Sequence, residues 1–247
     1  MRPLDELLLF YPKKFPDGDW EPDWLQYEDI WFPSVDGTEI HGWYCPAPEP
    51  RAVVLYAHGN GGNVAYRAKR LQRLQTDMGC SVLIFDYRGY GRSHGRPSVK
   101  GILADAEAAR HKLAQLAQVD LGDIVLLGRS LGGAVATQLA AHSPARGLIL
   151  ESTFCSLRTV ARHHYPKLSW LVKRQKLNSI ELIKQHQRPL LISHGDADEI
   201  VPYQLGCDLF EAANDPKQLI TIPGGLHNDP HPDDYYVALD AFLKELE

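Results

Sequence analysis

Ser130 lies in a pattern that can make a serine hydroxyl a nucleophile. The pattern Gly-x-Ser-x-Gly spans residues 128–132, between an apolar run at 124–127 and a helical stretch at 134–142. A serine on a sharp strand-to-helix turn projects its hydroxyl from the carboxyl end of the strand, and the glycines leave room for neighbouring backbone. The alternative is a glycine-rich turn in which the serine only caps the helix. The surrounding pattern favours a nucleophile.

A serine nucleophile needs a base, and a histidine base needs an acid to orient it. His227 follows the last apolar run of the chain and precedes the C-terminal helical stretch. Three candidate acids, Asp196, Asp198 and Glu199, follow the preceding run, and at least one of them must be an ordinary surface residue. The resulting order of serine, acid and histidine along the chain belongs to one of the several folds that host such a triad.

Acyl transfer also needs N–H donors for the oxyanion that forms during the reaction. One candidate is the backbone N–H of Leu131, which follows the serine at the start of a helix. The other lies in the glycine-rich turn at 58–63, after the apolar run at 53–56. This turn matches neither of the common phosphate-loop patterns, so nucleotide binding is not expected. His58 and His194 also end apolar runs, but each precedes a glycine and is interpreted as structural.

No metal or organic cofactor is expected. His227 and His231 are four residues apart, but Pro230 and Pro232 break any helix that could bring them together, and the sequence offers no third ligand. The cysteines are widely spaced and form no Cys-x-x-Cys pattern, which argues against a zinc site or a disulfide scaffold and favours a cytoplasmic protein. They are Cys45, Cys80, Cys155 and Cys207.

The elements that must position these residues are six short apolar runs that alternate with helical stretches. The runs lie at 53–56, 82–85, 124–127, 148–150, 190–192 and 219–222. They are continuously apolar, as expected for strands covered on both faces. Strand–helix alternation predicts an α/β fold with a mostly parallel, doubly wound sheet and helices on both faces. Residues 27–32 and 39–45 flank an Asp-Gly turn and predict an antiparallel hairpin at the edge of the sheet.

The segment at about 155–188 interrupts this rhythm, because it contains no strand pattern and is too long for a simple connection. We interpret it as a short helical cap over a site, within a single domain that spans 1–247. Phe154, Leu157 and Trp170 are its candidates for contact with substrate. A basic cluster in this segment is expected to be a solvated helix face; its members are Lys173, Arg174 and Lys176.

The composition excludes several other classes of protein. The 247 residues are 44% hydrophobic and 23% charged, with a net charge of −5, so nucleic acids and anionic membrane surfaces are not expected partners. No apolar run approaches the ~18 residues of a membrane-spanning helix. The short apolar stretch at 7–11 is expected to be an N-terminal helix or hook that packs on the body, not a membrane anchor.

Taken in order, these motifs resemble those of the α/β-hydrolase superfamily over essentially the whole chain. Residues 58–63 resemble its oxyanion loop, 86–93 the loop after its second parallel strand, and 128–132 its nucleophile turn. The resemblance implies that Asn60 and Leu131 are the oxyanion donors, that Asp198 is the acid and that His227 is the base.

A closer resemblance, carried by residues 151–157 and 225–229, is to small esterase-like members related to depalmitoylating hydrolases. It implies a serine hydrolase that acts on small-molecule esters or thioesters without a cofactor. Alternatives are an acyl-protein thioesterase, an aminopeptidase or amidase with the same triad, and a non-catalytic interaction protein on a hydrolase scaffold.

Overall fold

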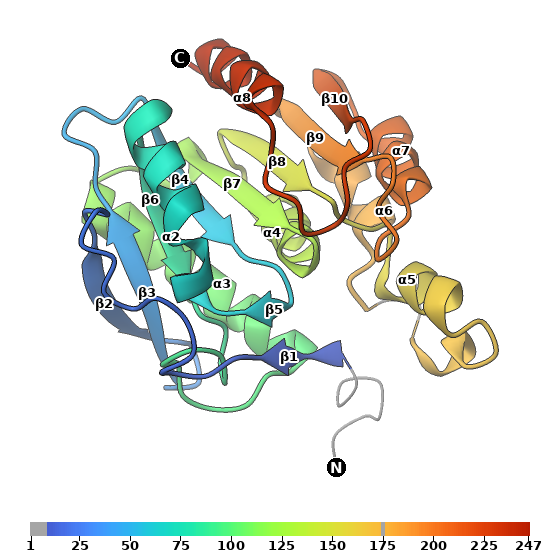
Figure 1. Ribbon diagram of the computed structural model, residues 1–247, viewed down its shortest axis with the longest axis horizontal. Helices are drawn as coiled ribbons and strands as arrows, with labels where there is room; N and C mark the ends of the chain where they lie inside the picture. Colours follow the sequence, from blue (N-terminus) through green and yellow to red (C-terminus); the bar gives the residue numbers. More distant parts are fainter. Residues whose placement is uncertain (1–8, 174–175) are drawn as a thin grey trace. The chain divides into compact units, whose positions relative to one another are not determined.

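The computed structural model describes residues 9–173 and 176–247, and every apolar run named above lies in one of its strands (Figure 1). Contacts within the chain group it into two units, residues 1–125 and 126–247. Each unit combines strands with helices, and the sheet is mostly parallel, as predicted. A single domain over 1–247 stays a prediction.

The first unit contains the predicted antiparallel hairpin. Its strands follow the order β4-β6-β3-β2, in which β4 and β6 are parallel while β3 is antiparallel to both β6 and β2. Every residue of β4 and β6 is buried, as the continuous apolar runs predicted. The strands are β2 (Glu28–Pro33), β3 (Glu39–Cys45), β4 (Ala52–Ala57) and β6 (Cys80–Phe85).

The helices of the first unit cover these strands, with α2 in front of them and α3 behind them in Figure 1. The longest helix is α3 (Val99–Ala117), whose N-cap residue, Ser98, accepts a hydrogen bond from the Gly101 N–H. Shorter elements complete the unit. They are β1 (Tyr11–Pro12), β5 (Gly61–Gly62), η1 (Val64–Arg67), α2 (Ala68–Gln72), η2 (Arg73–Asp77) and η3 (Leu121–Asp123).

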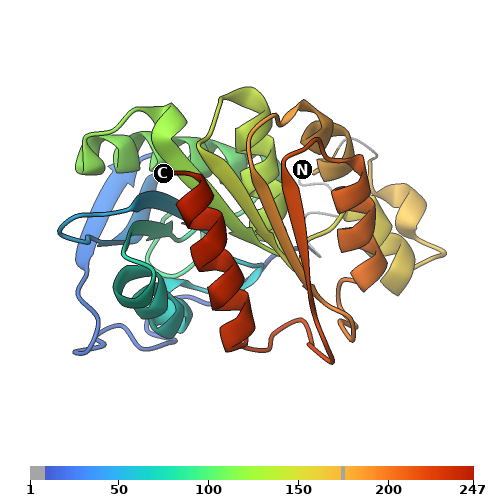
Figure 2. The same ribbon diagram turned by 90° about the horizontal axis from the view of Figure 1, so that it is seen from above.

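The second unit contains the strands β10-β9-β8 and, from Leu126 onward, β7, in this order, with β8, β9 and β10 parallel. Figure 2 shows α8 on one face of these strands and α4 on the other. Parallel strands place their carboxyl ends, and the loops that follow them, at one edge of the sheet. The elements are β7 (Ile124–Arg129), α4 (Leu131–His142), β8 (Gly147–Glu151), β9 (Leu190–Gly195), α7 (Tyr203–Ala212), β10 (Lys217–Ile222) and α8 (Asp233–Glu245).

The expectation that every apolar run is covered on both faces is wrong for β10. Gln218 and Thr221 are exposed, and the other residues of this strand are only half-buried. The reason is its position, because β10 is the last strand in the order and, within the described residues, pairs with β9 alone.

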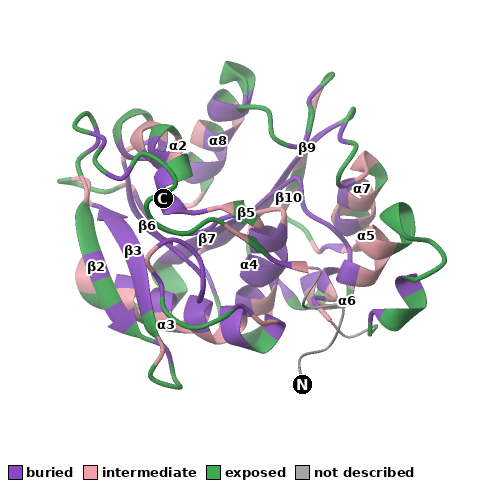
Figure 3. Ribbon diagram, turned by 60° about the horizontal axis from the view of Figure 1, so that its bottom comes forward, coloured by how far each residue is buried: buried purple, intermediate pink, exposed green. Residues whose placement is uncertain are grey.

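The described part of the predicted cap segment contains short helices and no strand, as expected (Figure 3). Its helices are α5 (Leu157–His164), η4 (Ser169–Leu171), α6 (Ser179–Leu182) and η5 (Ile183–Gln185). The prediction that the basic cluster forms a helix face is wrong for Lys173 and Lys176. Both residues lie outside helices, because the backbone leaves the helical conformation and becomes extended at Val172. Arg174 lies outside the described residues.

The N-terminal stretch is described only from Leu9 onward, so Leu7 and Leu8 of the predicted hook lie outside the described residues. Phe10 is buried, and β1 pairs in parallel with β5. Of the helices in the described ranges, none is long and apolar enough to cross a membrane. The cytoplasmic location stays a prediction.

A buried ion pair anchors the loop after β6 to α3. The Arg88 guanidinium donates to Asp105 through Nη2 at 2.7 Å and through Nε at 3.0 Å, and the Arg88 backbone N–H donates to the same carboxylate at 2.9 Å. Asp105 is fully buried, while the second partner of Arg88, Asp36, is exposed. Removing Asp105 would therefore leave a cation with little access to water and one partner fewer.

We expect Asp105→Ala to lower the free energy of unfolding by about 3 kcal/mol, because the Arg88 charge loses its buried partner. The matched control is Asp77→Ala, which breaks the exposed Asp77–Arg73 pair and should cost less than ~0.5 kcal/mol. Urea unfolding of both variants gives the comparison. Equal losses would show that the Arg88–Asp105 pair contributes no more than a surface pair.

Candidate active site

Ser130 is held in a backbone conformation that residues other than glycine rarely adopt. It lies between β7 and α4 with φ 53° and ψ −116°. Its N–H donates to the Glu151 carbonyl at 2.8 Å, and the Thr153 hydroxyl donates to the Ser130 carbonyl at 2.8 Å. Both partners lie at the end of β8 or just beyond it, so a neighbouring strand keeps Ser130 in this conformation.

The glycine at the start of the pattern is required by the tightness of this turn. A Cβ at Gly128 would overlap the backbone of Gly132. A side chain at position 128 is therefore incompatible with the approach of α4 to β7, which agrees with the interpretation of the motif as a sharp strand-to-helix turn.

The structure brings Ser130, His227 and Asp198 together within the second unit. His227 Nε2 lies 3.1 Å from Ser130 Oγ, and His227 Nδ1 lies 2.7 Å from Asp198 Oδ2. His227 comes from the loop between β10 and α8, and Asp198 from the loop after β9. His227 and Asp198 are both buried. An imidazole that donates its Nδ1–H to the carboxylate has a free lone pair at Nε2 that can accept the serine proton.

Asp198 is fixed by backbone donors from its own loop. Its Oδ1 accepts hydrogen bonds from the N–H groups of Ile200 at 2.9 Å and Val201 at 2.8 Å. Burial by itself raises the pKa of Asp198, but hydrogen bonds from His194, His227 and Val201 outweigh it and hold this pKa below its ordinary value. The carboxylate is therefore charged at neutral pH and can orient His227.

The other two candidate acids have different surroundings. Asp196 is exposed and accepts a hydrogen bond from the Gly224 N–H at 2.6 Å, while Glu199 is exposed as well. Asp196 therefore ties together the loops after β9 and β10, whereas only Asp198 of the three contacts the His227 ring in the described residues.

Two residues that sequence reasoning did not assign to the site support it. His194 is fully buried; its Nε2 lies 2.8 Å from the Val201 carbonyl and 3.3 Å from Asp198 Oδ2. Arg129, at a variable position of the serine pattern, donates to the carbonyls of His227 and, at 3.2 Å, Asp229. The sequence carries a weak signal for both, since His194 directly ends a strand and Arg129 precedes Ser130.

The two predicted oxyanion donors are backbone groups. Leu131 is the first residue of α4, where N–H groups have no partner within the helix. Asn60 belongs to the turn after β4 in the first unit, and its side chain is engaged: Oδ1 accepts from the Tyr90 hydroxyl at 2.8 Å and Nδ2 donates to the Leu9 carbonyl at 2.5 Å. The oxyanion roles of Leu131 and Asn60 stay predictions.

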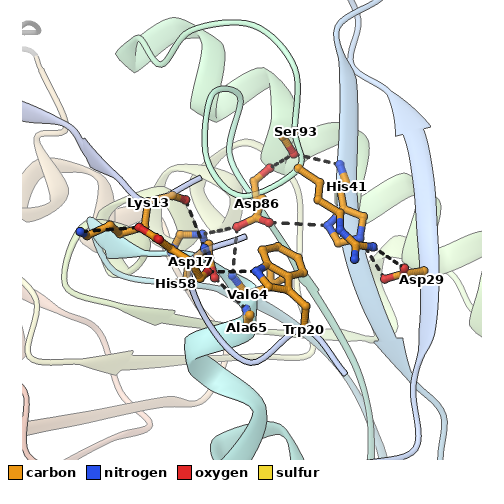
Figure 4. Close-up of polar contacts among 12 residues, drawn as sticks. Lys13, Asp17, Trp20, Asp29, His41, His58, Val64, Ala65, Asp86 and Ser93 are labelled. Carbon is orange, nitrogen blue, oxygen red and sulfur yellow. Dashed lines mark hydrogen bonds and ion pairs between the residues drawn. The ribbon is translucent and has the colours of Figure 1, made fainter. Parts of the chain in front are cut away.

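A buried carboxyl group, Asp86, holds the end of the turn that contains Asn60 (Figure 4). Asp86 Oδ1 accepts from the Val64 N–H at 3.0 Å and lies 3.7 Å from His58 Nε2. His58 Nδ1 donates to the Gly59 carbonyl at 2.7 Å, and burial lowers the pKa of His58 to about 3, so this ring is neutral. Asp86 Oδ2 faces His41 Nδ1 at 3.6 Å. His58 is thus a structural residue of the turn, as interpreted from the sequence.

The predicted substrate-contacting residues differ in their exposure. Phe154 and Leu157 are buried, whereas Trp170 is 66% exposed and its indole N–H donates to the Lys167 carbonyl at 3.1 Å. Two surface cavities of about 260 and 360 Å³ in the second unit are lined by other residues, at 140–145 with 185–188 and around β10. Substrate contact by Phe154, Leu157 and Trp170 stays a prediction.

His231 does not join His227 in the structure. Its Nε2 lies 3.8 Å from Glu151 Oε2, and its ring stacks on Tyr235 at a centroid distance of 4.0 Å. Within residues 9–173 and 176–247, no group of three or more His, Cys, Asp or Glu side chains could hold a metal ion. The absence of a metal or cofactor stays a prediction.

Comparisons with known proteins identify the family of the chain. Residues 48–182 match the Hydrolase_4 family, described as serine aminopeptidase, S33. An uncharacterised protein of Mycobacterium tuberculosis is 39% identical, and the match covers 97% of this chain and 86% of that protein. The α/β hydrolase domain-containing protein WAV2 of Arabidopsis thaliana is 36% identical, over 83% of this chain and 73% of WAV2.

Similarity extends to solved structures at the level of the fold. An esterase of Pyrococcus furiosus superposes with a TM-score of 0.81 at 18% identity, covering 97% of this chain and 98% of the esterase. The family match spans more than half of the chain, and relatives above 30% identity span most of it. The chain therefore belongs to the Hydrolase_4 (serine aminopeptidase, S33) family and has an α/β-hydrolase fold.

Proposed function

We propose that this hydrolase cleaves carboxylic esters or thioesters through an acyl-enzyme on Ser130. His227 Nε2 takes the hydroxyl proton of Ser130 as Oγ attacks the acyl carbonyl, and the N–H groups of Leu131 and Asn60 donate to the oxyanion of the tetrahedral intermediate. His227 then gives its proton to the leaving alcohol or thiol. Water, deprotonated by the same ring, releases the carboxylic acid and restores Ser130.

The observation that carries this proposal is the unbroken chain from Ser130 Oγ through the His227 ring to the Asp198 carboxylate, at 3.1 and 2.7 Å. Two further observations on Ser130 and Asp198 support the proposal. The strained backbone at Ser130 presents the hydroxyl, and the lowered pKa of Asp198 keeps its carboxylate charged beside the imidazole. A non-catalytic scaffold is not expected to combine a strained serine with a charged carboxylate beside a histidine ring.

An aminopeptidase is the second candidate, because the matching family carries that description. An aminopeptidase must recognise the charged amino terminus of its substrate, which calls for a carboxylate beside the site. Residues 152–180, which make up most of the predicted cap, contain no Asp or Glu. This composition favours an ester or thioester substrate without a cationic amine. Small-molecule esters and acyl-protein thioesters are both consistent with it.

Ser130→Ala should lower kcat for p-nitrophenyl acetate by at least ~10³-fold, because the variant cannot form an acyl-enzyme. The variant should stay folded, since alanine keeps the backbone hydrogen bonds to Glu151 and Thr153. A fluorophosphonate probe should label the wild-type chain at Ser130 and leave Ser130→Ala unlabelled. Retention of more than a tenth of the activity, or labelling at another serine, would contradict the proposal.

Asp198→Asn should lower kcat by about 10²–10⁴-fold, because an amide stabilises the wrong tautomer of His227. Asp196→Asn is the matched control: it lies in the same loop and contacts Gly224 instead of the ring, so its kcat should change less than ~10-fold. Steady-state kinetics on one soluble ester compares the two. If Asp196→Asn were the more damaging change, Asp196 and not Asp198 would be the acid.

Replacing the oxygen leaving group by nitrogen separates the two candidate functions. An esterase should hydrolyse p-nitrophenyl butyrate and the corresponding thioester at a far higher kcat/KM than an aminoacyl p-nitroanilide, because the site has no group assigned to an ammonium. Both substrates require Ser130 in either case. A higher kcat/KM for the aminoacyl p-nitroanilide would assign the chain to the aminopeptidases.

A further inference from the structure

One segment of the chain has a charge opposite to that of the whole. The protein has a net charge of −5, yet residues 152–180 contain no acidic residue. The same residues contain six lysines and arginines: Arg158, Arg162, Lys167, Lys173, Arg174 and Lys176. A local cationic region of this kind attracts an anionic partner even when the average charge of the chain repels it.

The same segment exposes large apolar side chains. Tyr165 is 64% exposed, Leu168 55% and Leu171 45%. Trp170 is 66% exposed, which is more than any of the other four tryptophans. These four lie within seven consecutive positions that include η4. A cluster of exposed apolar side chains usually marks an interaction site, because its contact with water is unfavourable until a partner covers it.

Cationic side chains lie before, between and after these apolar residues along the chain. Arg162, Lys167 and Lys173 are exposed and flank the apolar residues along the chain. We call these three cations together with Tyr165, Leu168, Trp170 and Leu171 the cap surface. It comprises Arg162 near the end of α5 and residues that follow this helix, which Figure 1 shows at the margin of the second unit.

We propose that the cap surface docks this hydrolase onto an anionic lipid membrane. Tyrosine and tryptophan prefer the level of the lipid headgroups, leucines insert into the boundary of the hydrocarbon, and lysine and arginine pair with anionic headgroups. The cap surface contains all three kinds of side chain. The two leucines favour lipid over nucleic acid, because RNA bases stack on aromatic rings and offer no counterpart for aliphatic side chains.

Docking at this surface places the candidate active site beside the membrane. The His164 ring, at the end of α5, lies 2.8 Å from the Ile200 carbonyl through Nε2, and Ile200 lies in the loop that holds Asp198. Ile200 is itself 45% exposed. An exposed apolar residue in the loop of the catalytic acid proposed above is therefore hydrogen-bonded to the end of α5, next to the cap surface. The docking proposal does not depend on that catalytic role.

The test measures partition of the full chain onto vesicles by sedimentation. We expect binding to vesicles of two parts phosphatidylcholine and one part phosphatidylglycerol, and little binding to phosphatidylcholine alone. The triple variant Arg162→Gln/Lys167→Gln/Lys173→Gln should lower the partition coefficient about 100-fold, because each cation near an anionic surface contributes about 1 kcal/mol. Trp170→Ser/Leu171→Ser should lower it by at least ~10-fold.

The matched control makes the same change of charge elsewhere. Lys69, Arg96 and Lys100 are exposed in the first unit, and Lys69→Gln/Arg96→Gln/Lys100→Gln should change the partition coefficient less than ~3-fold. Far-ultraviolet circular dichroism and the thermal midpoint of each variant show that it is folded. The Ser130→Ala variant should bind vesicles like the wild type, so an error in the proposed catalysis leaves this result intact.

Tryptophan fluorescence gives a second measurement that charge alone does not change. Lipids brominated on the acyl chain should quench the fluorescence of Trp170 in bound protein, and this part of the quenching should be absent in Trp170→Phe. Equal partition of the two triple variants would overturn the proposal, as would equal quenching of wild type and Trp170→Phe. Tighter binding of polyuridine RNA than of anionic vesicles would overturn it in favour of a nucleic-acid surface.

Discussion

The strained backbone of Ser130 is the constraint on which the rest of the site depends. A residue other than glycine at φ 53° and ψ −116° costs about 1–3 kcal/mol, and the surroundings must hold it there. The end of β8 does so through the Glu151 carbonyl and the Thr153 hydroxyl, and the missing side chain at Gly128 lets α4 approach β7. Without these three supports, the hydroxyl would not point from the strand end toward His227.

The remaining groups of the site follow from the parallel strands. The loops after β9 and β10 start from neighbouring strand ends, so Asp198 and His227 arrive side by side although they are far apart in sequence. Their contact is then adjusted by short local bonds. The Ile200 and Val201 N–H groups hold the carboxylate, and Arg129 holds the carbonyl of His227. The order of the strands brings the Asp198 and His227 side chains close together, and local hydrogen bonds orient them.

The strands and the serine turn could be predicted because their patterns are local. A continuous apolar run and a Gly-x-Ser-x-Gly turn leave few alternative conformations. The choice among Asp196, Asp198 and Glu199 could not be made from spacing alone, because it depends on where each side chain points in a folded loop. The support from His194 was missed for the same reason. The half-exposed β10 shows a further limit, since an apolar run does not reveal whether its strand ends a sheet.

The cap segment shows that the net charge of a chain does not predict the charge of each part of its surface. A net charge of −5 argues against anionic partners for the chain as a whole, while residues 152–180 contain only cationic charges apart from histidine. The exposed fraction of each side chain adds information that the composition does not contain, because the sequence pattern of Leu168, Trp170 and Leu171 is equally typical of a buried core. The structure leaves these side chains at the surface beside lysines and arginines, which is the arrangement that suits an anionic interface.

The central claim is that Ser130 carries the acyl group between the two halves of the reaction. The most direct measurement is mass spectrometry of the protein mixed with p-nitrophenyl butyrate and quenched in acid within the first turnover. We expect a butyryl adduct on the peptide that contains Ser130, formed at the rate at which p-nitrophenol is released. Release of p-nitrophenol in the first turnover with no adduct, or with the adduct on another residue, would contradict it.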